Sequence, residues 1–243
     1  MCTVTFIPGA KGGYILTTSR DEKASRPPAA GPIIEKFNGY SLLFPRDLKG
    51  GGTWIACDNQ NKTVCLFNGA FKAHIPKYPY RKSRGLIVLD FFTFDSILKF
   101  SENYDFENIE PFTLIITDGL FLKEFKWDGE RTYLLNHDVK KPAIWSSITL
   151  YSTEIIKLRE SWFRDWINRH PDLSQSDMFD FHLSAGDGNK EYGILMERKE
   201  LSLRTVSITS IVSSKEKTIM IYLDLLNNLK REKVLLHSSS RIA

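Results

Sequence analysis

Short segments rich in β-branched and aromatic residues lie towards both ends of this chain, and they restrict the folds that it can adopt. Segments 2–7 and 14–18 flank a stretch of turn-forming residues, and segments 54–57 and 63–68 flank a second polar stretch. We therefore predict two β-hairpins in the first third of the chain. Further strands are predicted at 112–117, 120–127, 131–135, 203–211 and 218–223.

The helical signal is strongest at 153–170, where apolar residues recur three or four positions apart and Pro171 blocks continuation. Other helices are predicted at 84–92, 94–102 and 175–183. Because strands cluster at both ends with helices between and after them, the order predicts layered sheets covered by helices rather than regular βαβ alternation. The sequence therefore favours an α+β fold.

Pro27, Pro28 and the pair Gly31-Pro32 follow the first hairpin closely, and they predict a long loop there. The chain contains no internal repeat, no low-complexity linker and no shift in composition. We therefore expect one domain over residues 1–243.

The charge pattern argues against a nucleic-acid partner. The 243 residues include 33 basic and 29 acidic side chains, a net charge of +4, and acids are interspersed with bases nearly throughout. Nucleic-acid binders usually concentrate basic charge on one face, whereas here the densest basic stretch, 230–233, reads as solvated surface. The sequence contains no run of about 18 apolar residues, so no membrane-spanning helix is predicted. The first residues lack the features of a signal peptide. We expect a cytoplasmic protein without a membrane partner.

Metal and nucleotide cofactors are not expected either. The three cysteines are an odd number without metal-ligand spacing, and the five histidines are scattered along the chain. No glycine-rich phosphate loop follows a predicted strand, since Gly50-Gly51-Gly52 does not match such a motif. The expected partner is a small molecule, and the sequence leaves the oligomeric state open.

Antiparallel register places several polar residues at the strand ends. If Ile7 pairs with Tyr14, position 2 falls opposite about Ser19, so Arg20 and Asp21 lie beside the start of the chain. In the second hairpin, pairing of Cys57 with Thr63 places Asn68 near Gly52. If both hairpins belong to one sheet in the right order, Cys2, Arg20, Asp21 and Asn68 converge.

Such a cluster has a coherent chemistry. Removal of Met1 leaves Cys2 with a thiol and a free α-amine, so that nucleophile and general base occupy one residue. Arg20 would favour the thiolate, Asp21 would hold the amine, and the Asn68 amide would stabilise an oxyanion. The alternatives are a buried strand cysteine, a surface Arg-Asp-Glu salt-bridge cluster and an Asn-Gly turn without catalytic meaning.

Four segments in the first 70 residues, in this order and spacing, resemble the NRDE-motif family, also called the transport and Golgi organisation protein 2 family. They are Met1-Cys2-Thr3-Val4, Thr18-Ser19-Arg20-Asp21-Glu22, Ser25-Arg26-Pro27 and Gly51-Gly52-Thr53-Trp54-Ile55-Ala56. The resemblance implies a relative of the N-terminal nucleophile hydrolases with a four-layer αββα sandwich. In the cysteine branch of these enzymes, which cleaves non-peptide amides, Cys2, Arg20 and Asp21 match the catalytic positions, and Asn68 resembles an oxyanion donor.

The chain departs from the family pattern at three positions. The name motif has Asn where this chain has Ser19. Many members carry Ser-Asn where this chain has Ser146-Ser147, and a Thr-Arg pair where this chain has Thr205-Val206. If those residues are a second oxyanion donor and a second basic group, they are missing or relocated here.

The combined hypothesis is a cysteine amidohydrolase that cleaves the C–N amide bond of a small acylated amine through a Cys2 thioester, without a cofactor. Trp54, His74 and Ser147 are the predicted substrate-binding residues. The alternative is a non-catalytic carrier of haem or acyl-chain ligands on the same fold, which the departures at Ser147 and Val206 motivate.

Overall fold

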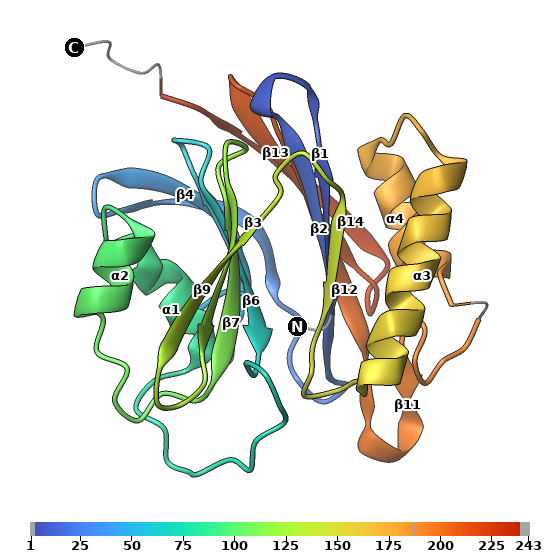
Figure 1. Cartoon of the computed structure of the whole chain (residues 1–243), viewed down its shortest axis with the longest axis horizontal. Coiled ribbons are helices and arrows are strands. Elements are labelled where there is room, and N and C mark those ends of the chain that lie inside the picture. The colour runs from blue at the N-terminus through green and yellow to red at the C-terminus, as the bar shows by residue number, and fades with distance from the viewer. Residues whose placement is uncertain (1–2, 187, 239–243) are drawn as a thin grey trace.

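Two antiparallel β-sheets face each other in this computed structural model, and α-helices cover the outer face of each (Figure 1). The structure describes residues 3–186 and 188–238. The fold is a four-layer αββα sandwich of the α+β class, as the family resemblance implies.

Sheet A has the strand order β10-β1-β2-β12-β13-β14, with β11 paired to β12. Its strands are β1 (Thr3–Pro8), β2 (Tyr14–Lys23), β10 (Ala143–Ser146), β11 (Glu197–Arg198), β12 (Leu203–Ser213), β13 (Lys217–Asp224) and β14 (Leu229–Leu236). Sheet B follows chain order from β3 to β9. Its strands are β3 (Ala30–Phe37), β4 (Tyr40–Arg46), β5 (Ile55–Asp58), β6 (Thr63–Asn68), β7 (Phe112–Thr117), β8 (Leu122–Trp127) and β9 (Thr132–His137).

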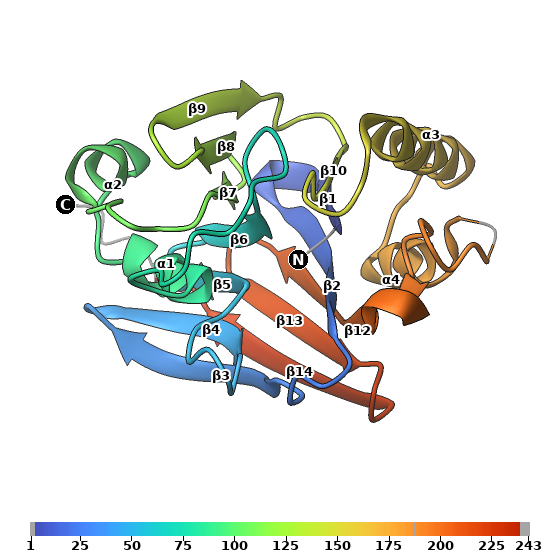
Figure 2. The ribbon, with the colours of Figure 1, turned by 90° about the horizontal axis from the view of Figure 1, so that it is seen from below.

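The helices divide between the two outer layers. They are α1 (Arg84–Phe91), α2 (Ile97–Asn103), α3 (Thr153–Arg169) and α4 (Gln175–Ser184). Figure 2 shows α1 and α2 on the side of sheet B, with α3 and α4 beside sheet A. Side-chain oxygens of Ser96, Ser152 and Ser174 accept hydrogen bonds from main-chain N–H groups at the starts of α2, α3 and α4, which satisfies donors that a helix leaves unpaired at that end.

Each interface between layers has its own apolar core. Phenylalanines such as Phe91, Phe100 and Phe125 fill the space between sheet B and its helices. Leu16 and Ile55 belong to the cluster between the two sheets. The third cluster, between sheet A and its helices, is much smaller, and its buried members among the described residues are Ile7, Phe163, Met178, Phe181 and Ile194. The partly buried rings of Trp162 and Trp166 pack against this cluster beside Phe163, so the aromatic face of α3 is used for packing.

Polar side chains supplement this small third core. We call the buried set Thr3, Thr5, Ser19, Arg159 and His182 the polar layer; all five are fully buried. The Arg159 guanidinium donates to Thr3 Oγ1 (2.8 Å) and to the carbonyl oxygens of residues 192 and 193 (2.9 and 2.6 Å). His182 contacts Thr5 Oγ1 through Nε2 (2.9 Å) and Ser19 Oγ through Nδ1 (2.7 Å). These contacts attach α3 and α4 to the first two strands.

The predicted hairpins are confirmed, although they lie in different sheets. In the first hairpin Thr3 pairs with Ser19, one residue from the predicted register, and in the second Cys57 pairs with Thr63 as predicted. The condition that both hairpins belong to one sheet is not met, because β1–β2 belongs to sheet A and β5–β6 to sheet B. Their ends are brought together by the stacking of the two sheets.

The long loop predicted after the first hairpin is also wrong, since β3 and β4 occupy that region. Pro32 does not prevent this, because β3 is the edge strand of sheet B and the register shifts between Ala30 and Pro32. Proline is tolerated on edge strands and at bulges. The basic stretch 230–233 is exposed, as predicted, and forms part of the edge strand β14, where charge discourages pairing with another chain.

In the part of the chain that the structure describes, no helix is both long enough and apolar enough to cross a lipid bilayer.

Candidate active site

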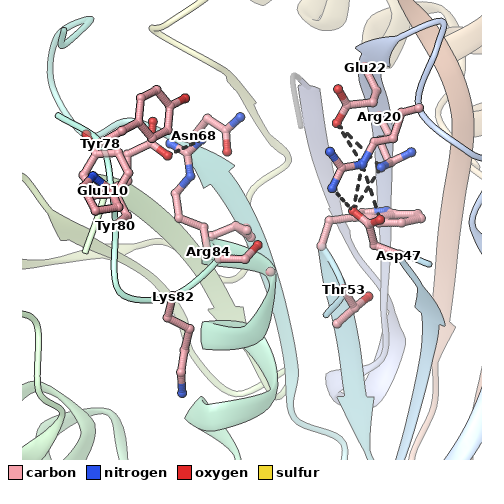
Figure 3. Close-up of a pocket in the computed structure, with 16 residues that line it drawn as sticks. Arg20, Glu22, Asp47, Thr53, Asn68, Tyr78, Tyr80, Lys82, Arg84 and Glu110 are labelled. Carbon is pink, nitrogen blue, oxygen red and sulfur yellow. Dashed lines mark hydrogen bonds and ion pairs between the residues drawn. The ribbon is translucent and has the colours of Figure 1, made fainter. Parts of the chain in front are cut away.

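Arg20 on β2 points towards the space between the two sheets. Its guanidinium lies 4.6 Å from the centre of the Trp54 ring, within the range of a cation–π contact. Its Nη2 atom is 3.3 Å from Asp47 and 3.7 Å from Glu22 (Figure 3). Burial lowers the pKa of Arg20, while the charges of Asp47 and Glu22 act in the opposite direction. A buried guanidinium is therefore held charged by two carboxylates.

Asp47, just after β4, is the anion that two arginines share. Arg26 donates to it at 2.6 Å and Arg20 at 3.3 Å, and the main-chain N–H of Gly50 donates at 3.2 Å. Burial alone would raise the pKa of Asp47, but these donors outweigh it and hold the pKa below its ordinary value. Asp47 therefore fixes the position of Arg20 from the opposite sheet.

Asp21 faces the other side of sheet A, because neighbouring strand residues alternate between faces. Its carboxylate accepts hydrogen bonds from Tyr151 Oη (3.0 Å) and Thr205 Oγ1 (2.6 Å). The Tyr151 ring in turn lies 3.5 Å from the Arg159 guanidinium. The register of β12 against β2 shifts between Thr205 and Ser207, so Val206 occupies a bulge directly beside the Arg20-Asp21 pair.

A cavity of about 500 Å³ opens beside Arg20, and we call it the polar cavity. Its charged lining residues are Arg20, Glu22, Arg26, Asp47, Lys82, Arg84 and Glu110. Asn68, at the end of β6, lies across the cavity from Arg20, beside Tyr78 and Tyr80 (Figure 3). The two Tyr residues come from the segment between β6 and α1. The cavity offers charges of both signs to a ligand.

Asn68 also borders a second cavity of about 170 Å³. Ser147 lines this cavity and donates from Oγ to the main-chain oxygen of Asn68 (3.1 Å). Ser146, also in the lining, pairs with Thr3, while Thr3 pairs on its other side with Ser19. The first described residue of β1 therefore lies between a strand that carries Arg20 and a strand that reaches the second cavity.

The predicted site residues divide into groups in the structure. Arg20, Trp54 and Asn68 line the polar cavity, whereas Ser147 lines the second cavity. Asp21 is one residue from Arg20 but on the opposite face of the sheet. Cys2 lies outside the described residues.

His74 belongs to the edge of this site rather than to its centre. Its Nε2 is 3.0 Å from Glu110, and Glu110 also pairs with Arg84 at 3.0 Å. Burial and the negative charge of Glu110 act in opposite directions on the pKa of Arg84, and burial outweighs the charge and lowers it. His74 therefore reaches the polar cavity through Glu110, which does line it.

Sequence reasoning missed Asp47, Glu110 and Tyr151, because each comes from a segment far from its partner in the chain. Asp47 follows a strand that was read as a loop, so nothing placed it opposite Arg20. Tyr151 lies between predicted elements. A signal was present for Arg159: an arginine in the middle of the apolar face of a helix needs buried partners.

Solved structures with the same architecture include a conjugated bile acid hydrolase from Clostridium perfringens. Its TM-score is 0.59 at 11% identity, with 100% of each chain covered; a second structure of that enzyme gives 0.57 at 12%, covering 99% and 98%. The Caenorhabditis elegans ortholog of N-acylethanolamine-hydrolyzing acid amidase gives 0.50 at 12% identity, covering 86% of this chain and 92% of that one. The fold is that of the N-terminal nucleophile hydrolases.

Within this class, the family model named Transport and Golgi organisation 2 matches residues 1–190, and the chain belongs to that family. None of the curated protein sequences matches this chain.

Proposed function

We propose that this protein is a cysteine hydrolase that cleaves a non-peptide C–N amide bond in a small acylated amine. The observation that carries the proposal is the position of Thr3, which pairs with Ser19 on one side and with Ser146 on the other. Arg20 lines one cavity and Ser147 the other, while Asn68 borders both. A nucleophile at position 2 would meet an amide there.

The reaction begins at Cys2 after removal of Met1. The α-amine takes the thiol proton, and the sulfur forms a bond to the amide carbonyl carbon while the side-chain amide of Asn68 donates to the oxyanion. The C–N bond then breaks, and the leaving amine takes a proton from the α-ammonium group. Water adds to the thioester, giving its proton to the α-amine, and the C–S bond breaks to release the acid and regenerate the thiol.

Arg20 and Asp21 have different roles in this scheme. The proposal requires the Cys2 thiol to face the same side of sheet A as Arg20, whose charge would lower the thiol pKa. Asp21 would hold the α-amine from the other side. Its two described hydrogen bonds, from Tyr151 and Thr205, fix the orientation of its carboxylate.

A carrier on the same fold is the second candidate, favoured by Ser147. Many family members have asparagine there, and the Ser147 hydroxyl is engaged with the Asn68 carbonyl and with Thr149 Oγ1 (2.9 Å). With a hydroxyl in place of a second amide donor, the fold would bind a haem or acyl-chain ligand without turnover.

The test is made on protein expressed without an N-terminal tag. Intact mass first establishes whether Met1 is removed, and a thiol-directed β-lactone probe then identifies the reactive cysteine. We expect labelling at Cys2, loss of amidase activity in Cys2→Ala, and a loss of about 100-fold or more in kcat for Asn68→Ala. Cys65→Ala is the matched control and should retain activity.

Two outcomes would contradict the hydrolase. Full retention of Met1 would block the α-amine, and preferential labelling of Cys57 or Cys65 would remove the proposed nucleophile. Haem or acyl-chain binding that survives Cys2→Ala, with no turnover in the parent protein, would establish the carrier instead.

A further inference from the structure

The cavity beside Ser147 lies next to a larger one. The second cavity, of about 170 Å³, and a third, of about 620 Å³, share the lining residues Glu124, Ile144, Trp145 and Glu160. Two cavities with four common wall residues are adjacent, and together they extend from Asn68 along β10 and α3. We call the pair the β10 groove.

The position of the groove follows from the topology. β10 is an edge strand of sheet A, paired with β1 on one side. All four β10 residues line one or both parts of the groove, so the groove follows the edge that β1 leaves uncovered. Because Ser146 pairs with Thr3, the groove starts beside the first described residue of β1.

The walls of the groove include several apolar side chains that are only partly covered. Ile144 and Trp145 come from β10, and Ile156 and Ile167 come from α3; all four are half-buried. Phe163 is buried beneath them. Binding of a ligand that removes the remaining apolar surface of these side chains from water is favourable, because it lowers the free energy of the complex.

Most of the charge at the narrow part of the groove is already neutralised. The Glu124 carboxylate pairs with Lys126 Nζ (2.7 Å) and His137 Nε2 (2.9 Å). The His137 ring also lies against Trp145, with ring centres 5.3 Å apart. The groove therefore offers a strip of apolar side chains next to a paired carboxylate, whereas most of the side chains that line the polar cavity on the other side of Asn68 are polar or charged.

We propose that the β10 groove binds the apolar acyl chain of the substrate, and that the polar cavity binds the amine portion. This inference rests on the proposed function. The assignment of the two ends follows from the two linings, because the polar cavity presents charged side chains of both signs, which suit an amine portion such as glycine that carries both an ammonium and a carboxylate group. The acyl portion stays bonded to sulfur until water arrives, and an uncharged chain is retained by apolar walls.

The experiment uses N-acyl glycines with straight chains of six, eight and ten carbons, below their micelle concentrations. Each buried methylene should raise kcat/KM about fourfold, so each two-carbon step should raise it about 15-fold. N-acetyl alkylamines of matched length place the chain on the other side of the amide and should show no such increase. An increase with the alkylamines, or none with either series, overturns the assignment.

Glu160→Trp tests the location of the chain. Glu160 is exposed on α3 and lines both parts of the groove, so an indole there would block the passage between them. We expect the ten-carbon substrate to lose 10-fold or more in kcat/KM while the six-carbon substrate is little changed. Lys157→Trp, an exposed position on the same helix, is the control and should keep the parent chain-length profile.

Calorimetric binding of octanoate and decanoate to Cys2→Ala separates this inference from the proposed function. Tighter binding of the longer chain, abolished by Glu160→Trp, supports the groove even if the parent protein has no amidase activity. Amidase activity without chain-length dependence or fatty-acid binding refutes the groove and leaves the hydrolase proposal standing. Equal effects of Glu160→Trp and Lys157→Trp on all chains also refute it.

Discussion

Replacing His182 by glutamine is expected to make the free energy of unfolding less sensitive to acid. The imidazole is fully buried, with one nitrogen facing Thr5 and the other Ser19. Thr5 Oγ1 donates to the main-chain oxygen of Thr17 (3.4 Å), so it accepts from Nε2–H, and Nδ1 accepts from the Ser19 hydroxyl. The neutral imidazole satisfies this arrangement, and the imidazolium does not.

The size of the effect follows from the two pKa values. Burial, reinforced by the charge of Arg159, lowers the pKa of His182 from 6.5 to about 3. Between these values the unfolded chain binds a proton that the native protein excludes, so stability falls as the pH drops below about 6.5 and continues to fall until about 3. From pH 7.5 to 5.0 this one group should cost about 2 kcal/mol.

Urea denaturation at several pH values measures the effect. With a slope of about 2 kcal/mol per molar urea, the midpoint of the parent protein should drop by about 1 M more than that of His182→Gln between pH 7.5 and 5.0. The constant difference between the two proteins above pH 7 serves as the internal control for lost packing. Parallel acid sensitivity in both proteins would refute the inference that a neutral, buried imidazole links the helices to sheet A.

Three further predictions concern the site and the cores. Gly52→Ala should destabilise the protein by about 2–3 kcal/mol in urea denaturation, because its Cβ would lie 2.2 Å from main-chain carbon in α1; Gly51→Ala, with open space and φ of +70°, should cost only about 1–2 kcal/mol. Asp47→Asn should lower the free energy of unfolding by about 2–4 kcal/mol at pH 7. That difference should vanish as acid protonates the native carboxylate, whose pKa is held low. Burial raises the pKa of the Cys65 thiol to about 12 and raises that of the Cys57 thiol further. Iodoacetamide at pH 8 should therefore modify neither cysteine until the protein unfolds. Detection of either labelled cysteine by mass spectrometry of the native protein would contradict this prediction.

Local patterns were enough to predict most of the elements. The two hairpins are confirmed because turn-forming residues separate their strands, and the long helix at 153–170 is confirmed because its apolar residues have a clear period. β10, β14 and the β3–β4 pair were missed for physical reasons. β10 has only four residues and β14 is almost wholly exposed, so neither has an apolar period. Pro27 and Pro28 before β3 and Pro32 within it give this region the composition of a loop.

The site shows a different limit of sequence reasoning. Register within a hairpin placed Arg20 beside the start of β1 correctly, because pairing depends on local geometry. Which sheet each hairpin joins depends on contacts between distant segments, and that decides whether Asn68 meets Arg20. Asp47 and Tyr151 could not be predicted as partners for the same reason, because each contact joins segments that are far apart in the chain.

The polar layer has a consequence for how the molecule is assembled. Two apolar surfaces can slide past each other with little change in energy, but a guanidinium and an imidazole with fixed partners satisfy their hydrogen bonds in one arrangement only. Helices α3 and α4 can therefore pack on sheet A in one position only, and the same contacts fix the position of β1. A single substitution in the polar layer leaves a neighbouring buried group without its hydrogen-bond partner, so these residues are expected to change together during evolution.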